Sequence, residues 1–237
     1  MPRFRPTFWP TLMAMPAFLV LIGLGIWQFE RLHWKEGLIA AREAAIAAPP
    51  VAVPRDAAGA SALEFHRVRA TGEFLNDREF FLGASNENGT TGYRVITPLR
   101  LDDGALLLVD RGWIPGNLKD PAKREAGQLA GTVEIEGLLR QGATAKPNWF
   151  VPDNRCDINY WFWLDIPAMA RCGGLQKVLS FTVDAGPAQN PGGYPRGGFT
   201  RVALPNDHLQ YAITWFALAI GLAVVYVVYH RGRKAAG

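Results

Sequence analysis

The stretch PNDHLQYAITWFALAIGLAVVYVVYHRGRK, residues 205–234, decides the fold. No formally charged side chain lies between Asp207 and Arg231, which leaves 23 residues, or about 34 Å of helix at 1.5 Å per residue. That length crosses a hydrocarbon core of about 30 Å. Tyr211 and Trp215 lie near one end of the run and Tyr226 and Tyr229 near the other, and basic residues (Arg231, Arg233 and Lys234) follow it, as is typical of a transmembrane helix. We therefore predict a membrane span here.

A second apolar run lies near the N-terminus. It begins after Arg5 and ends before Glu30, and it holds 24 residues without formal charge. A cleaved signal peptide is the alternative, because Arg3 and Arg5 precede the run. However, the run is longer than a usual signal core, and small-residue cleavage sites occur only around residues 44–48. We interpret the run as a retained membrane anchor.

The two runs flank 178 residues, from Glu30 to Asp207, which is ample for a packed core. The chain outside the basic tails has 20 lysines and arginines against 21 aspartates and glutamates. The excess positive charge therefore lies in the tails, and the positive-inside rule places both termini in the cytoplasm. The domain then lies in the periplasm of a bacterium or the intermembrane space of a mitochondrion, and we favour a bacterial inner membrane. A nucleic-acid partner is not expected, since it would require a basic face on the folded domain.

The middle of the chain alternates apolar and polar residues with a period of two, as β-strands do. The turn Asp102-Asp103-Gly104 predicts a hairpin. Short helical segments are expected at 119–128 and 167–171, a loop at 186–198 and an Ala/Pro-rich linker at 49–62. The predicted strands are EFHRVRATGEF (64–74), DREFFLGA (77–84), YRVITPLRL (93–101), ALLLVDRGWIP (105–115), TVEIEGLLRQ (132–141), YWFWLDI (160–166) and LQKVLSFTVD (175–184).

These patterns predict an α+β membrane protein, in which two transmembrane helices flank a mostly antiparallel, barrel-like β domain outside the membrane. The first helix is expected to continue past the membrane as far as about Ala48, before Pro49-Pro50. The expected segments are a cytoplasmic basic tail (1–8), the first transmembrane helix (9–29), a helix extension and linker (30–62), the periplasmic β-rich domain (63–205), the second transmembrane helix (206–229) and a second cytoplasmic tail (230–237).

Motifs that would indicate an enzyme are missing from the sequence. None of the three serines lies in a GxSxG elbow, and no HExxH, GxGxxG or Walker pattern occurs. The VDRGW string favours a strand end at which Asp110 and Arg111 make ion pairs or backbone hydrogen bonds. Cys156 and Cys172 are either a disulfide or two buried thiols, and a functional pair is the remaining alternative. We expect no catalytic residues.

Two of the four histidines lie where the predicted helices leave the membrane. His33 and His208 are both on its outer side, whereas His66 falls on a strand and His230 in the basic tail, where both are interpreted as incidental. An imidazole at a membrane boundary is commonly a solvated interfacial residue. It is also a common axial ligand of haem iron, and polar residues at membrane depth are candidates for function.

The aromatic residues near these histidines favour the second interpretation. An apolar cleft between the helices would suit a large, flat, membrane-soluble ring with an open metal position. We expect its walls to be Trp27, Trp34, Tyr211 and Trp215.

The chain resembles the Surfeit-locus cytochrome oxidase assembly factors. The resemblance runs from Trp9 to Tyr229, and its most specific parts are WQxxRLxWK (27–35), VDRGW (109–113) and NxHLxYAxTWF (206–216). It implies two helices around an extramembrane domain and a role in the maturation of a haem-copper oxidase. The cysteine pair and the glycine-rich loop at 192–198 lie outside the resemblance.

Bacterial members of this family handle haem a on its way to the oxidase catalytic subunit. The resemblance therefore implies transient haem a, bound between the helices with His208 as the iron ligand. His33 is a weaker candidate for a second ligand. Arg31 and Lys35 would meet the haem propionates or, alternatively, lipid headgroups. The implied partners are the catalytic subunit of the oxidase, the lipid bilayer and, as a further candidate, haem a synthase.

Two other functions compete with this one. The chain would be a scaffold without haem, which stabilises an oxidase assembly intermediate, if His208 only packed. It would be a membrane enzyme acting on haem or a quinol if VDRGW supplied polar catalytic groups, but no constellation of residues supports that. A haem absorption band that depends on His208 separates the haem-binding protein from the scaffold.

Overall fold

The structure is a computed structural model that describes residues 4, 6–142, 146–198, 200 and 204–232. It comprises two compact units, a helical unit (residues 1–41 and 203–237) and a β-rich unit (residues 42–202). Arg3, Arg5, Arg233 and Lys234, on which the predicted orientation in the membrane depends, lie outside the described residues.

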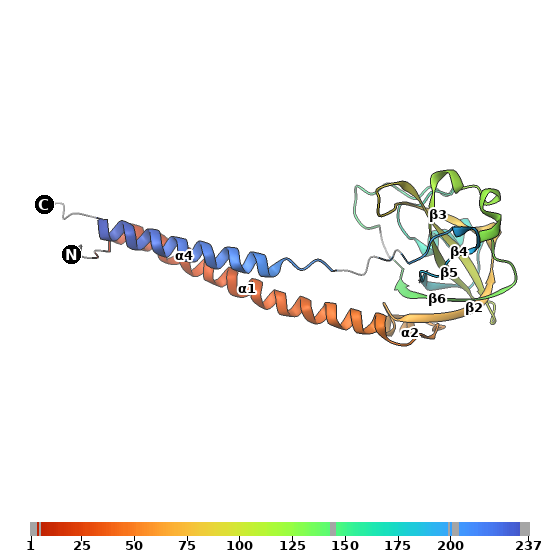
Figure 1. The fold of residues 1–237 in the computed structure, drawn as a ribbon, viewed down its shortest axis with the longest axis horizontal. Helices are drawn as coiled ribbons and strands as arrows, with labels where there is room; N and C mark the ends of the chain where they lie inside the picture. Colours follow the sequence, from red (N-terminus) through yellow and green to blue (C-terminus); the bar gives the residue numbers. More distant parts are fainter. Residues whose placement is uncertain (1–3, 5, 143–145, 199, 201–203, 233–237) are drawn as a thin grey trace. The chain divides into compact units, whose positions relative to one another are not determined.

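The helical unit is built on two long helices, α1 (Phe8–Ala47) and α4 (His208–Gly232), which run side by side (Figure 1). Both are long and apolar enough to cross a membrane. At 1.5 Å per residue, the 40 residues of α1 extend over about 60 Å, twice the thickness of a hydrocarbon core. The chain is thus an α+β membrane protein, as predicted.

Small residues bring α1 and α4 close together. Gly25 is buried against Phe216, and a Cβ added to Gly25 would lie 2.6 Å from the ring. Ala212 and Ala219 of α4 and Leu32 of α1 are buried as well. Small side chains at such a contact allow two backbones to approach, which is the common way for helices to pack in a membrane.

A closed circuit of hydrogen bonds joins the other ends of the helices. The Tyr226 hydroxyl donates to Thr11 Oγ1 (2.6 Å), the Thr11 hydroxyl to the Thr7 carbonyl (2.7 Å) and the Thr7 hydroxyl to His230 Nε2 (3.1 Å). His230 Nδ1 donates to the Tyr226 carbonyl (2.8 Å). The assignment of His230 to the tail as an incidental residue is therefore wrong, because it belongs to α4 and is fully buried.

The β-rich unit is a closed barrel with two additional strands. β2 pairs with both β6 and β4, so that the order β2-β6-β7-β5-β4 returns to β2; β1 and β3 add to β2 and β4. β5 and β7 are parallel, and the other barrel pairs are antiparallel. This connectivity is that of a five-stranded Greek-key barrel of the OB type. The strands are β1 (Val51–Ala52), β2 (Arg67–Phe74), β3 (Phe80–Ser85), β4 (Thr91–Leu101), β5 (Leu106–Pro115), β6 (Thr132–Gln141) and β7 (Val178–Ala185).

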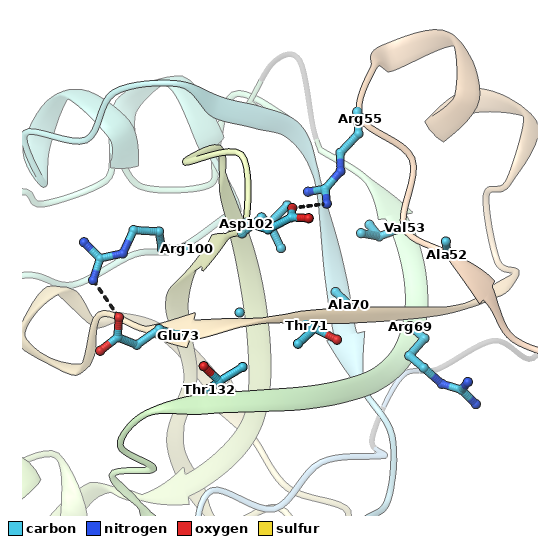
Figure 2. Close-up of a pocket in the computed structure, with 12 residues that line it drawn as sticks. Ala52, Val53, Arg55, Arg69, Ala70, Thr71, Glu73, Arg100, Asp102 and Thr132 are labelled. Atoms are coloured by element: carbon cyan, nitrogen blue, oxygen red, sulfur yellow. Dashed lines mark hydrogen bonds and ion pairs between the residues drawn. The ribbon is translucent and has the colours of Figure 1, made fainter.

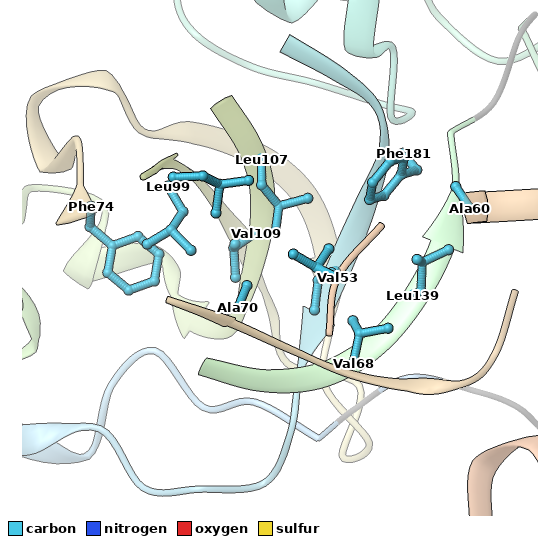
Figure 3. Packing of buried hydrophobic residues seen from close by; sticks show 12 residues of the cluster. Val53, Ala60, Val68, Ala70, Phe74, Leu99, Leu107, Val109, Leu139 and Phe181 are labelled. Carbon is cyan, nitrogen blue, oxygen red and sulfur yellow. The ribbon is translucent and has the colours of Figure 1, made fainter. Parts of the chain in front are cut away.

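The apolar residues of alternate strand positions fill the barrel. Leu99, Leu107, Val109 and Leu139 are fully buried there, each from a position facing inward (Figure 3). Val183 of β7 is fully buried in the same cluster. The remaining elements are α2 (Ala57–Ala62), α3 (Ile166–Cys172) and the 3₁₀ turns η1 (Asn76–Arg78), η2 (Gly116–Leu118), η3 (Pro121–Gly127) and η4 (Pro191–Gly193).

Two local predictions are wrong. Residues 49–62 are not a bare linker, because they form β1 and α2, Asp56 caps α2, and Val53 and Ala60 pack into the barrel core (Figure 3). The segment 160–166 forms no strand beyond isolated bridges. Trp161 is instead buried against Phe80 in a second apolar cluster outside the barrel core.

Cys156 and Cys172 form a disulfide, one of the three alternatives that the sequence left open. The bridge joins the segment that carries Trp161 to α3. Both segments contribute to the second apolar cluster, so the disulfide cross-links the two segments that pack against each other there.

Candidate functional site

His208 is the first residue of α4 and is half-buried beside α1. Its Nδ1 lies 2.6 Å from Oε1 of Gln28 on α1. Gln28 shares a helix face with the buried Gly25 and Leu32, at spacings of three and four. The packing that brings Gly25 against Phe216 therefore also brings Gln28 to the imidazole.

The contact fixes which nitrogen of His208 remains open. An amide oxygen can only accept a hydrogen bond, so Nδ1 carries the proton. Nε2 then bears the lone pair, and it has no hydrogen-bond partner among the residues that the structure describes. A neutral imidazole with a free Nε2 and an Nδ1 held by a second residue is the usual arrangement of a metal-binding histidine.

Three of the four aromatic residues predicted for the cleft are not enclosed between the helices. Trp27, Trp34 and Tyr211 expose 52%, 50% and 55% of their surface, whereas Trp215 is half-buried. Trp27 and Trp34 lie on α1 away from the face that holds Gly25. The structure thus brings together His208, Gln28 and the packed faces of the helices, with the aromatic rings outside them.

The other predicted residues of α1 make contacts within that helix. The Arg31 guanidinium lies 3.8 Å from the centre of the Trp34 ring. His33 Nδ1 lies 3.2 Å from Glu36, its ring meets Phe29 edge-on, and its side chain is 61% exposed. His33 and His208 therefore have different partners in this structure. Lys35 is half-buried on the same helix.

Two residues at this end of the helices were not recognised as functional candidates from the sequence. In the sequence, Gln28 stands only within the motif WQxxRLxWK and Asn206 only within NxHLxYAxTWF, and neither pattern indicates a role for them. The amide oxygen of Asn206 is buried and has no hydrogen-bond partner among the described residues. The motif that contains both Asn206 and His208 was the available signal.

The VDRGW string supplies buried charges to the outer wall of the barrel. Asp110 pairs with Arg94 (2.5 Å), which also contacts Asp184 (3.3 Å), and the Thr200 hydroxyl donates to Asp184 (2.9 Å). Burial raises the pKa of Asp110 to about 7; Arg94 opposes this rise and the Asp184 carboxylate adds to it. The pKa of Arg94 is raised, because the two carboxylates outweigh its burial.

Arg111, the next residue, points to a different cluster. It donates to the Gly127 carbonyl and lies 3.9 Å from Glu79, which forms a two-pronged ion pair with Arg124. Burial lowers the pKa of Arg111 to about 10, although Glu79 opposes the shift. The expected interpretation of Asp110 and Arg111 as paired residues agrees with both clusters, which join strands to loops.

A cavity of about 550 Å³ opens on the barrel between β2 and the turn after β4 (Figure 2). Its charged residues are already paired: Arg55 with Asp102 (2.6 Å) and Arg100 with Glu73 (2.8 Å) (Figure 2). No group of three or more His, Cys, Asp or Glu that could hold a metal occurs among the described residues. The imidazole with the open nitrogen, that of His208, belongs to the helical unit and does not line this cavity.

Known proteins resemble this chain over most of its length. A sequence profile of the SURF1 family matches residues 15–220, a range that includes Gln28, the barrel and His208. The SURF1-like protein of Monosiga brevicollis is 38% identical over 97% of this chain and 90% of its own. Surfeit locus protein 1 of Takifugu rubripes is 36% identical (85% and 90% covered), and that of Homo sapiens is 35% identical (83% and 69%).

Proposed function

The chain belongs to the SURF1 family, whose members are cytochrome c oxidase assembly factors, and on that premise we propose that it binds haem a and aids its insertion into the oxidase. The proposed site is the end of the helix pair where α4 begins. Haem a would be held there transiently, on the way to the catalytic subunit.

The open Nε2 of His208 is the observation that carries the proposal. Haem iron takes a neutral imidazole nitrogen as an axial ligand, and the iron is the electrophilic centre that the haem supplies. Gln28 holds the opposite nitrogen, so that the imidazole keeps its orientation and tautomer. A single histidine at the side of two helices also suits transfer, since a ligand held by one bond can leave more easily than one held by two.

The surroundings of His208 fit a membrane-soluble ring. Tyr211 and Trp215 lie one and two turns away on α4, and Trp27 precedes Gln28 on α1. Their exposed faces offer apolar surface beside the helix pair. We assign Arg31 and Lys35 to the propionates at the membrane boundary and His33 as the candidate for a second ligand. These roles are part of the proposal.

The proposed location is a bacterial inner membrane, crossed twice, with both termini in the cytoplasm and the barrel in the periplasm. The support is the positive-inside rule applied to the two candidate spans, α1 and α4. The equivalent sides in a mitochondrion are the matrix and the intermembrane space. In either membrane the proposed partners are the catalytic subunit of the oxidase and haem a synthase.

The test is the optical spectrum of the purified full chain, produced in cells that make haem a and in cells that do not. We expect a haem a band in the wild-type protein, and its loss in His208→Ala. His66→Ala is the control, because it removes an imidazole from the β-rich unit, where the ring contacts the Glu64 carbonyl and has no proposed role in binding haem. Exogenous imidazole should restore the band to His208→Ala, which a purely structural histidine would not allow.

The outcomes separate the competing functions. No band in the wild-type protein, although the cells contain haem a, would leave a scaffold that stabilises an assembly intermediate. An equal band in wild type and His208→Ala would assign the iron to another residue. Circular dichroism of each variant would establish that the helices remain folded.

A further inference from the structure

The amide oxygen of Asn206 is a buried acceptor without a donor among the described residues. Asn206 lies just before α4, two residues from His208. Proteins satisfy nearly all buried polar atoms, because an unpaired one loses its water without compensation. An exception beside a proposed ligand site therefore suggests that the ligand brings the missing donor.

Two of the neighbouring protein donors are already used. The backbone N–H of Tyr211 donates to the Asp207 carbonyl (3.2 Å), and His208 Nδ1 donates to Gln28 (2.6 Å). The other buried side-chain atoms without a partner in the described part of the chain all belong to the β-rich unit: Thr97 Oγ1, Gln128 Oε1, Arg140 Nε and Trp163 Nε1. Asn206 is thus the one such residue among those that the structure describes in the helical unit.

The ligand proposed for His208 exists in forms with and without a suitable donor. Haem a and haem o carry a hydroxyl on the carbon that joins their farnesyl tail to the porphyrin, whereas haem b has a vinyl group there. Two residues of chain span at most about 7 Å. A ring bound through His208 can therefore bring a substituent at its edge to Asn206.

We propose that Asn206 Oδ1 accepts a hydrogen bond from this hydroxyl, so that the site favours hydroxyl-bearing haems over haem b. The inference rests on the proposed function, since it needs haem on His208. A site that hydrogen-bonds a hydroxyl of its ligand discriminates against the analogue that lacks it, because the buried group then stays unpaired. One neutral hydrogen bond of this kind corresponds to about tenfold in affinity.

The experiment titrates the full chain in detergent micelles with haem a, haem o and haem b, and follows binding by absorbance. Asn206→Ala is expected to bind haem a and haem o about tenfold more weakly than the wild type, with the affinity for haem b unchanged. Binding of haem b then also reports an intact His208 site. Gln210→Ala is the matched control: it removes an exposed amide from the same end of α4 and should change none of the three affinities.

The results that would overturn the inference are distinct. Equal losses for all three haems would make the amide structural, and unchanged affinities would remove it from the site. If wild-type protein bound haem o as weakly as haem b, the formyl group of haem a would be the recognised feature instead. If Asn206→Ala did not fold, Asn206→Asp, which keeps an acceptor oxygen, must retain the preference.

Failure of the proposed function itself would look different. His208→Ala would then bind every haem as the wild type does, or the wild type would bind none. Neither result depends on Asn206, so the two proposals are tested separately by the same titrations.

Discussion

Replacing Asp110 by asparagine is expected to change how the stability of the barrel depends on pH. Asp110 is buried on β5, and its pKa is about 7 in the folded state against an ordinary value of 3.8. Between these values the folded state retains a proton that the unfolded state has lost. The free energy of unfolding therefore falls as the pH rises from about 4 to about 7, and it levels off above that range.

The size of the effect follows from the shift. At 1.36 kcal/mol per pKa unit, a rise of about three units corresponds to about 4 kcal/mol. Asparagine resembles the protonated acid and does not titrate. The stability of the Asp110→Asn variant, measured relative to wild type, should therefore improve by up to about 4 kcal/mol between pH 4 and pH 8.

Hydrogen exchange of the amides of β5 and β7 measures this in the intact chain, because it reports the free energy of opening of the barrel apart from the helices. The rates must be corrected for the intrinsic effect of pH. Asp153→Asn is the control, since that side chain is 90% exposed and should give a flat difference. A flat difference for Asp110→Asn as well would mean that Arg94 keeps Asp110 ionised throughout, and would refute the reasoning.

Two further substitutions test the packing of the barrel. Gly72→Ala should destabilise it by about 2 kcal/mol, because the added Cβ would overlap the Arg100 carbonyl where β2 and β4 close the barrel. Gly116→Ala is the control, since no atom lies within 4 Å of its added Cβ, and equal denaturation midpoints of the two variants would contradict the role of Gly72. Glu79→Leu should lower the free energy of unfolding by about 3–5 kcal/mol, because it leaves the buried Arg124 guanidinium without its carboxylate. A decrease of less than about 1 kcal/mol in the same denaturation assay would show that the Arg124 charge is hydrated.

The strands of the barrel could be predicted from the sequence because their inward positions are apolar at a strict period of two. β4, β5 and β6 begin and end within about two residues of the predicted ranges. The segment 160–166 has the aromatic composition of a strand, but its backbone bonds to a strand only at Trp161, which pairs with Phe81 and Gly83 of β3, and a side chain supplies the partner of the next residues. Asn154 Oδ1 accepts from the N–H groups of Phe162 and Trp163, which gives the backbone partners without a neighbouring strand.

The site could be predicted only in part. The histidine at the start of α4 stands in a recognisable motif, but its partner Gln28 is 180 residues away in the sequence. Their contact depends on the register of two antiparallel helices, which the packing of Gly25 on Phe216 sets. Helical spacing alone does not tell which face of α1 meets α4, so it could not show that Trp27 and Trp34 lie away from the face that holds Gly25.

Substitution of a charged or polar group should have a different effect in each of the two units. In the barrel, Arg94 pairs with Asp110 and Arg124 pairs with Glu79, so losing one partner changes the stability of the fold and hence the amount of protein in the cell. At the start of α4, His208 Nε2 and Asn206 Oδ1 have no partner among the described residues, so a change there should alter binding at normal abundance. Measuring protein level and haem content together for variants of both kinds would separate loss of the fold from loss of the site.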